Sequence, residues 1–271
     1  MRYCLALVAM GLLIVSAGSQ EKAPLALQER ERRATVINSV YDVNPRLEPV
    51  IRERITQARI LMQSHREQRQ FIAYLSTPIS SRGGSHTPTN AAVSAFVKTQ
   101  LEERYGPKLW VLDPAQFESL KGQDPAPQGG DFLYMWTQIL AGADGLGKDF
   151  DMVYFVGPND VRGYFTAQGA NAHANWLGEL HRYVDQRAER DERFRQEIAA
   201  NSEKRQAFVR FYGIRASSAF SLGAHDEWNL FVRVNRKRGV GEQIAMYFDG
   251  RPLSPAEMET EIKPGYELLT R

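Results

Sequence analysis

The sequence predicts an α/β protein: a Rossmann-like open parallel sheet flanked by helices, with an N-terminal helical arm and an inserted α-helical hairpin. Three observations lead to this prediction. Short apolar runs end in turn residues, these runs alternate with helical patterns, and the composition of 43% apolar and 24% charged residues is typical of a globular chain. Buried strands that alternate with helices are typical of βαβ units and of a parallel sheet covered on both faces.

Residues 1–17 are predicted to be a secretory signal peptide. Arg2 gives a short positive region, an apolar run extends from Cys4 to Val15, and a small-residue cleavage site follows at Ala17. A helix over this run would span about 18 Å, which is too short for a bilayer core of roughly 30 Å. We therefore expect an exported protein, periplasmic or secreted, without stable membrane insertion. Because Cys4 is the only cysteine, the mature chain would hold no disulfide and no thiolate metal site.

Residues 18–69 are predicted to form the helical arm. Apolar side chains recur at three- and four-residue steps from Leu47 to Met62, which gives one apolar stripe on a helix. The many Arg and Glu residues around this stripe are expected to form a solvated face.

The α/β domain is predicted over residues 70–271. Helical patterns lie between its expected strands, and a long, highly charged helical stretch at about 162–215 is expected as an insertion outside the sheet. The expected strands lie near residues 71–76, 109–112, 152–157 and 243–248.

Charge and known motifs exclude several function classes. The 34 basic and 32 acidic residues leave a net charge of only +2, so no nucleic-acid partner is expected. The charges of Arg182–Arg210 have mixed signs, which favours an exposed hairpin over an RNA or membrane patch. The five histidines do not pair with carboxylates at ligand spacing, so we expect no metal. The common cofactor, phosphate-loop and hydrolase fingerprints are absent, and no cofactor is expected.

The first candidate loop follows the opening strand of the domain and carries Ser80, Ser81, Arg82, Gly83 and Gly84. In a parallel sheet, ligands bind beyond the carboxyl ends of the strands. Hydroxyl groups, a guanidinium and backbone N–H groups before a helix N-terminus suit a phosphate. The alternative is an ordinary flexible connection, and composition alone leaves the two interpretations open.

The second candidate loop runs from Ser221 to Glu227 and enters a helix. Gly223 would let the backbone approach a ligand, and Glu227 lies in the first turns, where the helix dipole favours a carboxylate. The alternative is a plain N-terminal cap made by Ser221 or Asp226.

Together these segments resemble the nucleoside 2-deoxyribosyltransferase-like family, nearest its nucleoside 5′-monophosphate N-glycosidase branch. The resemblance rests on the Tyr74 strand Phe71–Ser76, the Ser80–Gly84 loop, the Asp-initiated strand Asp151–Val156, and the Ser221-x-Gly223-x-x-x-Glu227 segment. In the family, the loop that carries this serine follows the third strand almost directly. Here residues 157–220 intervene, which suggests an inserted hairpin beside the mouth of the site.

The resemblance implies a set of roles. Glu227 would be the nucleophile that attacks the anomeric carbon, Tyr74 would orient it, and Asp131 would be the general acid toward the base. The substrate-binding residues that it implies are Ser80, Ser81, Arg82, Gly83, Gly84, Ser221 and Gly223.

The function expected from the sequence is an N-glycosidase or N-glycosyl transferase acting on a nucleoside 5′-monophosphate or a related nucleotide. Cleavage of an N-glycosidic bond passes through an oxocarbenium-like state that a carboxylate stabilises or traps. Two alternatives stay open: a non-catalytic nucleotide- or sugar-binding Rossmann-like module, and an interaction protein of the envelope. The enzyme interpretation requires Tyr74 and Glu227 to lie within hydrogen-bond reach beside the 80–85 loop. The base, the sugar, the acceptor and the oligomeric state, a homodimer included, are left open.

Overall fold

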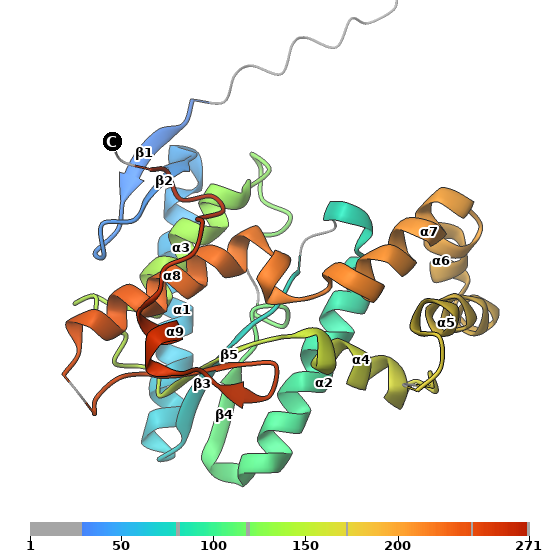
Figure 1. The fold of residues 1–271 in the computed structure, drawn as a ribbon. Helices are drawn as coiled ribbons and strands as arrows, with labels where there is room; N and C mark the ends of the chain where they lie inside the picture. Colours follow the sequence, from blue (N-terminus) through green and yellow to red (C-terminus); the bar gives the residue numbers. More distant parts are fainter. Residues whose placement is uncertain (1–28, 80–81, 118–119, 172, 240, 270–271) are drawn as a thin grey trace, which may run out of the picture.

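The computed structural model describes residues 29–79, 82–117, 120–171, 173–239 and 241–269 (Figure 1). Its centre is a five-stranded sheet with the strand order β4–β3–β5–β6–β7. The first four strands in that order are parallel, and the short edge strand β7 is antiparallel to β6. The strands span Phe71–Ser76 (β3), Leu109–Leu112 (β4), Met152–Phe155 (β5), Ala245–Phe248 (β6) and Arg251–Pro252 (β7).

The predicted α/β class and the predicted strand positions are confirmed. Each parallel strand lies within two or three residues of its expected range. In β3 every residue except Phe71 is buried, which explains its nearly continuous apolar sequence. The signal peptide expected at residues 1–17 lies outside the described residues.

One face of the sheet is covered by α1 (Glu48–Glu67), α3 (Gly129–Ala141) and α8 (Leu222–Lys237). From β3, Ile72 and Tyr74 point into this core, because alternate residues of a strand face the same side. The face is therefore the one on which Tyr74 can meet residues of α8.

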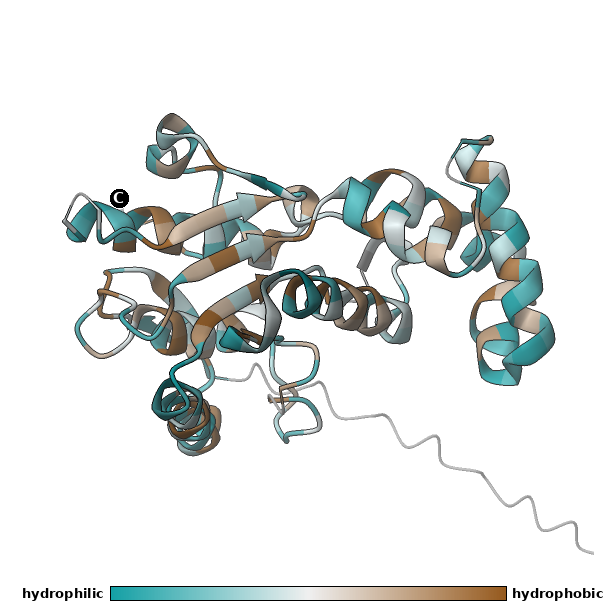
Figure 2. Ribbon diagram, turned by 90° about the horizontal axis from the view of Figure 1, so that it is seen from below, coloured by the Kyte–Doolittle hydropathy of each residue, from teal (hydrophilic) through white to brown (hydrophobic). Residues whose placement is uncertain are grey.

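The other face is covered by α2 (Thr87–Tyr105) and α4 (Pro158–Ala167). Ala73 and Leu75 of β3 point into this second core. In Figure 2 the strands form an apolar band between the flanking helices.

The charged stretch after α4 is helical and lies outside the sheet, as its sequence predicts. Figures 1 and 2 show α5, α6 and α7 as a group set to one side, beyond α2 and α4. Phe165 of α4 contacts Tyr183 and Tyr212, which joins the group to the second core. The segments are α5 (Trp176–Arg190), α6 (Glu192–Phe194), a π-helical turn Arg195–Ala199, α7 (Ser202–Arg210) and a second π-helical turn Phe211–Arg215.

The prediction of a helical arm over residues 18–69 is wrong for residues 31–43, and residues 18–28 lie outside the described part of the chain. Residues Glu31–Ala34 (β1) and Val40–Val43 (β2) pair as an antiparallel hairpin. Its turn contains Asn38 with a φ of 64°, a left-handed conformation that asparagine tolerates. The helix α1 has the expected apolar stripe, but that stripe is buried in the main core instead of forming an accessory element.

The C-terminal segment runs back along α8 after the short helix α9 (Pro255–Glu259). The carboxylate of Asp226 accepts hydrogen bonds from the backbone N–H groups of Gly265 and Tyr266, both at 2.7 Å. Asp226 thus ties down the C-terminal segment, and the helix cap is Ser221, whose hydroxyl accepts from the N–H of Ala224 at 3.4 Å.

Candidate functional site

A cavity of about 430 Å³ opens beyond the carboxyl end of β3. Its floor includes Glu227, and its walls come from the β3–α2 loop, the β4–α3 loop, α3, the second π-helical turn, the start of α8 and the C-terminal segment. Aromatic rings form much of the wall: Phe132, Trp136, Phe211, Phe220 and Tyr266. A mostly apolar cleft with a few polar groups is the usual form of a small-molecule site.

Glu227 is held by two buried hydroxyl groups of one strand. The Tyr74 hydroxyl donates to Oε1 of Glu227 at 2.6 Å, and the Ser76 hydroxyl donates to Oε2 at 2.6 Å. Tyr74 and Ser76 are fully buried, and Glu227 is 8% exposed where it meets the cavity. Since residues two apart on a strand face the same side, both hydroxyls are directed toward α8. The contact between Tyr74 and Glu227 that the sequence predicted is confirmed.

The Glu227 carboxyl group has a strongly perturbed acidity. Burial raises its pKa from 4.5 to about 7, and the negative charge of Asp226 adds to the effect. The hydrogen bonds from Ser76 and Tyr74 act in the opposite direction, because they stabilise the carboxylate. Burial and the nearby Glu227 also raise the pKa of the Tyr74 hydroxyl, so Tyr74 stays a hydrogen-bond donor. A buried carboxyl group poised near neutrality in a cleft is a common property of catalytic sites.

The chain returns to this site after the long helical stretch. The backbone N–H of Ser218 donates to the carbonyl of Val156 at 2.8 Å, and its hydroxyl donates to the carbonyl of Ser76 at 2.9 Å. Residues far apart in the sequence therefore meet at the ends of β3 and β5. As a result Ser221 and Gly223 line the cavity that contains Glu227.

The first candidate loop is described in part. Ser80 and Ser81 lie outside the described residues, and a 3₁₀ turn spans Arg82–Gly84. Gly83 lines the cavity. Gly84 packs instead against α7: its φ is 95°, and a Cβ there would lie 2.5 Å from the carbonyl oxygen of Ala207. The loop is thus braced by the helices that follow α4.

Asp131 is not brought to the cavity wall. Its carboxylate is fully buried, accepts from the N–H groups of Gln128 at 2.7 Å and Asn44 at 2.8 Å, and pairs with Arg30 at 3.0 Å. These contacts form a helix cap that also joins α3 to the end of β2. The placement favours a structural role and leaves the proposed acid without access to a bound base.

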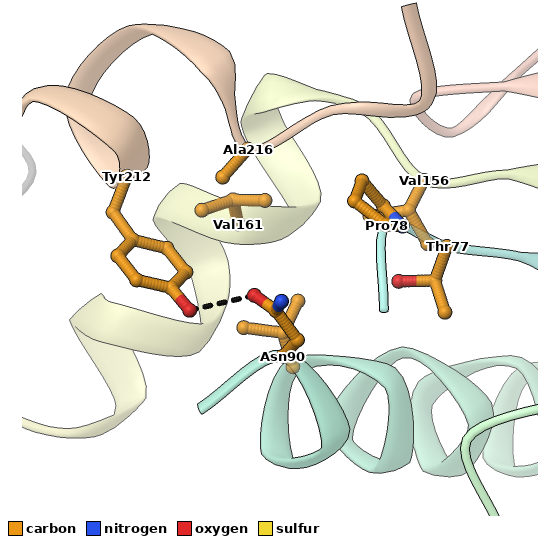
Figure 3. Close-up of a pocket in the computed structure, with 8 residues that line it drawn as sticks. Thr77, Pro78, Asn90, Val156, Val161, Tyr212 and Ala216 are labelled. Carbon is orange, nitrogen blue, oxygen red and sulfur yellow. Dashed lines mark hydrogen bonds between the residues drawn. The ribbon is translucent and has the colours of Figure 1, made fainter. Parts of the chain in front are cut away.

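A smaller hollow adjoins the main cavity and shares Thr77 and Pro78 with it (Figure 3). Its volume of about 10 Å³ has room for about one water molecule. The Tyr212 hydroxyl donates to Oδ1 of Asn90 at 2.6 Å across it, as the dashed line in Figure 3 marks. This contact fastens the second π-helical turn to α2.

Sequence reasoning missed several polar residues of the site, among them Ser76, Arg215 and Lys121. Ser76 could have been found from its spacing of two after Tyr74, which places both on one strand face. Arg215 and Lys121 line the cavity but belong to segments without a local motif. Only the folded chain brings them there.

The described residues contain no group of three or more His, Cys, Asp or Glu side chains that could hold a metal ion. Within the same residues, none of the helices is both long enough and apolar enough to span a bilayer.

The chain matches no protein-family model, no curated protein and no solved structure. The assignment of function therefore depends on the geometry of the cavity.

Proposed function

We propose that the protein is an N-glycosidase or N-glycosyl transferase that acts on a nucleoside 5′-monophosphate or a related nucleotide. The observation that carries this proposal is the Glu227 carboxyl group, held at 2.6 Å by Tyr74 and by Ser76, at the floor of an aromatic-walled cavity. The resemblance to the nucleoside 2-deoxyribosyltransferase-like family is supported by the same contact, since the family pairs these two residue types.

In the proposed reaction Glu227 acts as a carboxylate. One of its oxygens attacks the anomeric carbon, the bond from that carbon to the base nitrogen breaks, and the electron pair leaves with the base, which takes up a proton from solvent water. Water or a second base then attacks the same carbon, gives up a proton to solvent and releases the carboxylate. Tyr74 and Ser76 hold the carboxyl group in one orientation throughout, so that little reorganisation accompanies the reaction.

The remainder of the cavity suits the remainder of a nucleotide. Aromatic rings such as Trp136 and Phe132 offer faces for a base. The N-terminus of α8 at Ser221 and the backbone at Gly83 offer N–H groups and partial positive charge for a phosphate. We interpret the helical stretch of about residues 162–215 as an insertion at the mouth of this site.

The test is to incubate the purified protein with a panel of nucleotides and nucleosides and to follow release of free base by chromatography. Glu227→Gln is the matched variant, because it keeps size and polarity and removes the charge. We expect the wild type to release free base. In Glu227→Gln the rate of release should fall by several orders of magnitude. Binding without release would favour the non-catalytic module, and neither binding nor release would favour the interaction protein.

A further inference from the structure

Two cationic side chains of the cavity, Arg215 and Lys121, have no partner among the residues that the structure describes. Both are exposed and line the cavity, and within the described part of the chain neither makes a hydrogen bond or ion pair through its side chain. The only acidic residue among the cavity-lining residues that the structure describes is Glu227. The mouth of the cavity therefore carries an excess of positive charge.

Arg215 differs in this respect from most arginines of the neighbouring helices. Arg187 pairs with Asp191 at 3.2 Å, and Arg205 pairs with Asp185 at 2.6 Å. These ion pairs neutralise the guanidinium groups of Arg187 and Arg205. Arg215, at the point where the stretch re-enters the site, has all its side-chain donors free of partners within the described residues.

The backbone that carries Arg215 is firmly placed. It ends the π-helical turn Phe211–Arg215, whose Tyr212 is buried and bonded to Asn90 at 2.6 Å. Gly213 lies against α5, where a Cβ would come within 2.4 Å of Leu177. Phe211 of the same turn lines the cavity. The turn is thus packed between α2 and α5, and Arg215 extends from a rigid base.

We infer that Arg215, assisted by Lys121, binds the phosphate of the substrate and makes the helical stretch that ends at Arg215 the element that selects phosphorylated over unphosphorylated nucleosides. Guanidinium groups bind phosphate through paired N–H donors, and an ammonium group adds a point charge. The inference rests on the proposed function and names the residues that set its substrate class. A phosphate held at the mouth would orient the sugar with its anomeric carbon toward Glu227 and supply remote binding energy.

The experiment compares Arg215→Gln with Arg210→Gln. Arg210 is the matched control, because it is an exposed arginine of α7 that does not line the cavity and has no ion pair within the described residues. Each change is made in a Glu227→Gln background, so that binding is measured without turnover. The probes are nucleoside 5′-monophosphates, the matching nucleosides and inorganic phosphate, measured by calorimetry.

The expected result is a dissociation constant raised about 10- to 100-fold for monophosphates in Arg215→Gln, with nucleosides changed less than about 2-fold. Lys121→Gln should give a smaller loss, Arg215→Lys should restore part of the binding, and Arg210→Gln should match the parent. Equal affinities of Arg215→Gln and Arg210→Gln for every phosphorylated probe, or no binding of any such probe to the parent, would overturn the inference.

The base-release assay, repeated with Arg215→Gln in the wild-type background, separates this inference from the proposed function. If monophosphates bind in a way that depends on Arg215 but no base is released, the inference about Arg215 stands and the proposed enzymatic activity is wrong. Glu227-dependent base release that is insensitive to Arg215→Gln would retain the enzyme and reject the inference.

Discussion

Glu227→Gln should make the folded protein more stable at neutral and alkaline pH while it removes activity. The reason is the raised pKa of the buried carboxyl group, about 7 in the folded protein against 4.5 for the free side chain. Between about pH 4.5 and pH 7, the folded chain therefore keeps a proton on Glu227 that the unfolded chain has released. The free energy of unfolding therefore falls as the pH rises from about 4.5 to about 7.

The size of the effect follows from the same shift. Each pKa unit corresponds to about 1.4 kcal/mol, so the ionised Glu227 costs the fold about 3 kcal/mol above pH 7. Glutamine carries no charge at any of these pH values and avoids this cost. It weakens the hydrogen bonds from Tyr74 and Ser76, a loss of about 1 kcal/mol. The net gain expected at pH 8 is about 2 kcal/mol, or roughly 4–8 °C in melting temperature.

The assay is thermal and urea unfolding of wild type and Glu227→Gln at about pH 5 and pH 8. The variant should gain stability only at pH 8. Glu103→Gln serves as the control, because Glu103 is an exposed residue of α2 and should show no such pH dependence. A Glu227→Gln variant that is less stable than wild type at both pH values would refute the reasoning, because the carboxylate would then be a structural contact.

The remaining predictions concern residues around Glu227 and the chain terminus. Ser76→Ala removes one hydrogen-bond donor to the Glu227 carboxylate. The midpoint of the acidic limb of the pH–rate profile, expected near pH 7, should therefore move to a pH higher by about 0.5–1. An unchanged midpoint with lower activity at every pH would contradict a role of Ser76 in setting the pKa of Glu227. Ser221→Ala should lower kcat/KM for monophosphates about 10- to 100-fold and leave kcat/KM for nucleosides nearly unchanged. If Ser221 is only a helix cap, the variant should lose about 0.5–2 kcal/mol of folding stability and show no substrate dependence. Steady-state kinetics on both substrate types distinguish these outcomes. Asp131→Asn should cost about 1.5–3 kcal/mol of stability by calorimetry, because it removes the buried carboxylate that accepts from the partly buried Arg30. It should leave kcat of the folded fraction within about 2-fold, and a fall of 100-fold or more would restore Asp131 as the acid. The exported protein should begin near Gly18 by mass spectrometry, and recovery of an intact Met1 in the membrane fraction would argue against export.

The N-terminal hairpin shows where sequence patterns were insufficient. Strands β1 and β2 have only four residues each and contain charged residues such as Arg32 and Asp42, which pair across the ladder. Their stability comes from contacts far along the chain, for example between Tyr41 and Thr137 of α3 at 3.2 Å. A local window contains none of these contacts. It does carry strand signals that the prediction of a helix overlooked: Val40, Tyr41 and Val43 are residue types enriched in strands, and Asn38 is a turn residue.

The sequence by itself determined the four parallel strands of the main sheet, most of the helices around it and one long-range contact. Short apolar runs such as Phe71–Ser76 predict strands, because a strand that is buried on both faces consists almost entirely of apolar residues. The motifs around Tyr74 and Glu227 that resemble the family predict the contact between these two side chains. Tertiary structure decided which polar residues share that site. The Ser76 hydroxyl donates to Glu227, and the Asp131 carboxylate lies in a buried helix cap away from the cavity. Arg215 lines the cavity although its turn lies far from the other site residues in the sequence. Side-chain partners depend on packing between segments far apart in the chain, and spacing along the sequence does not encode that packing.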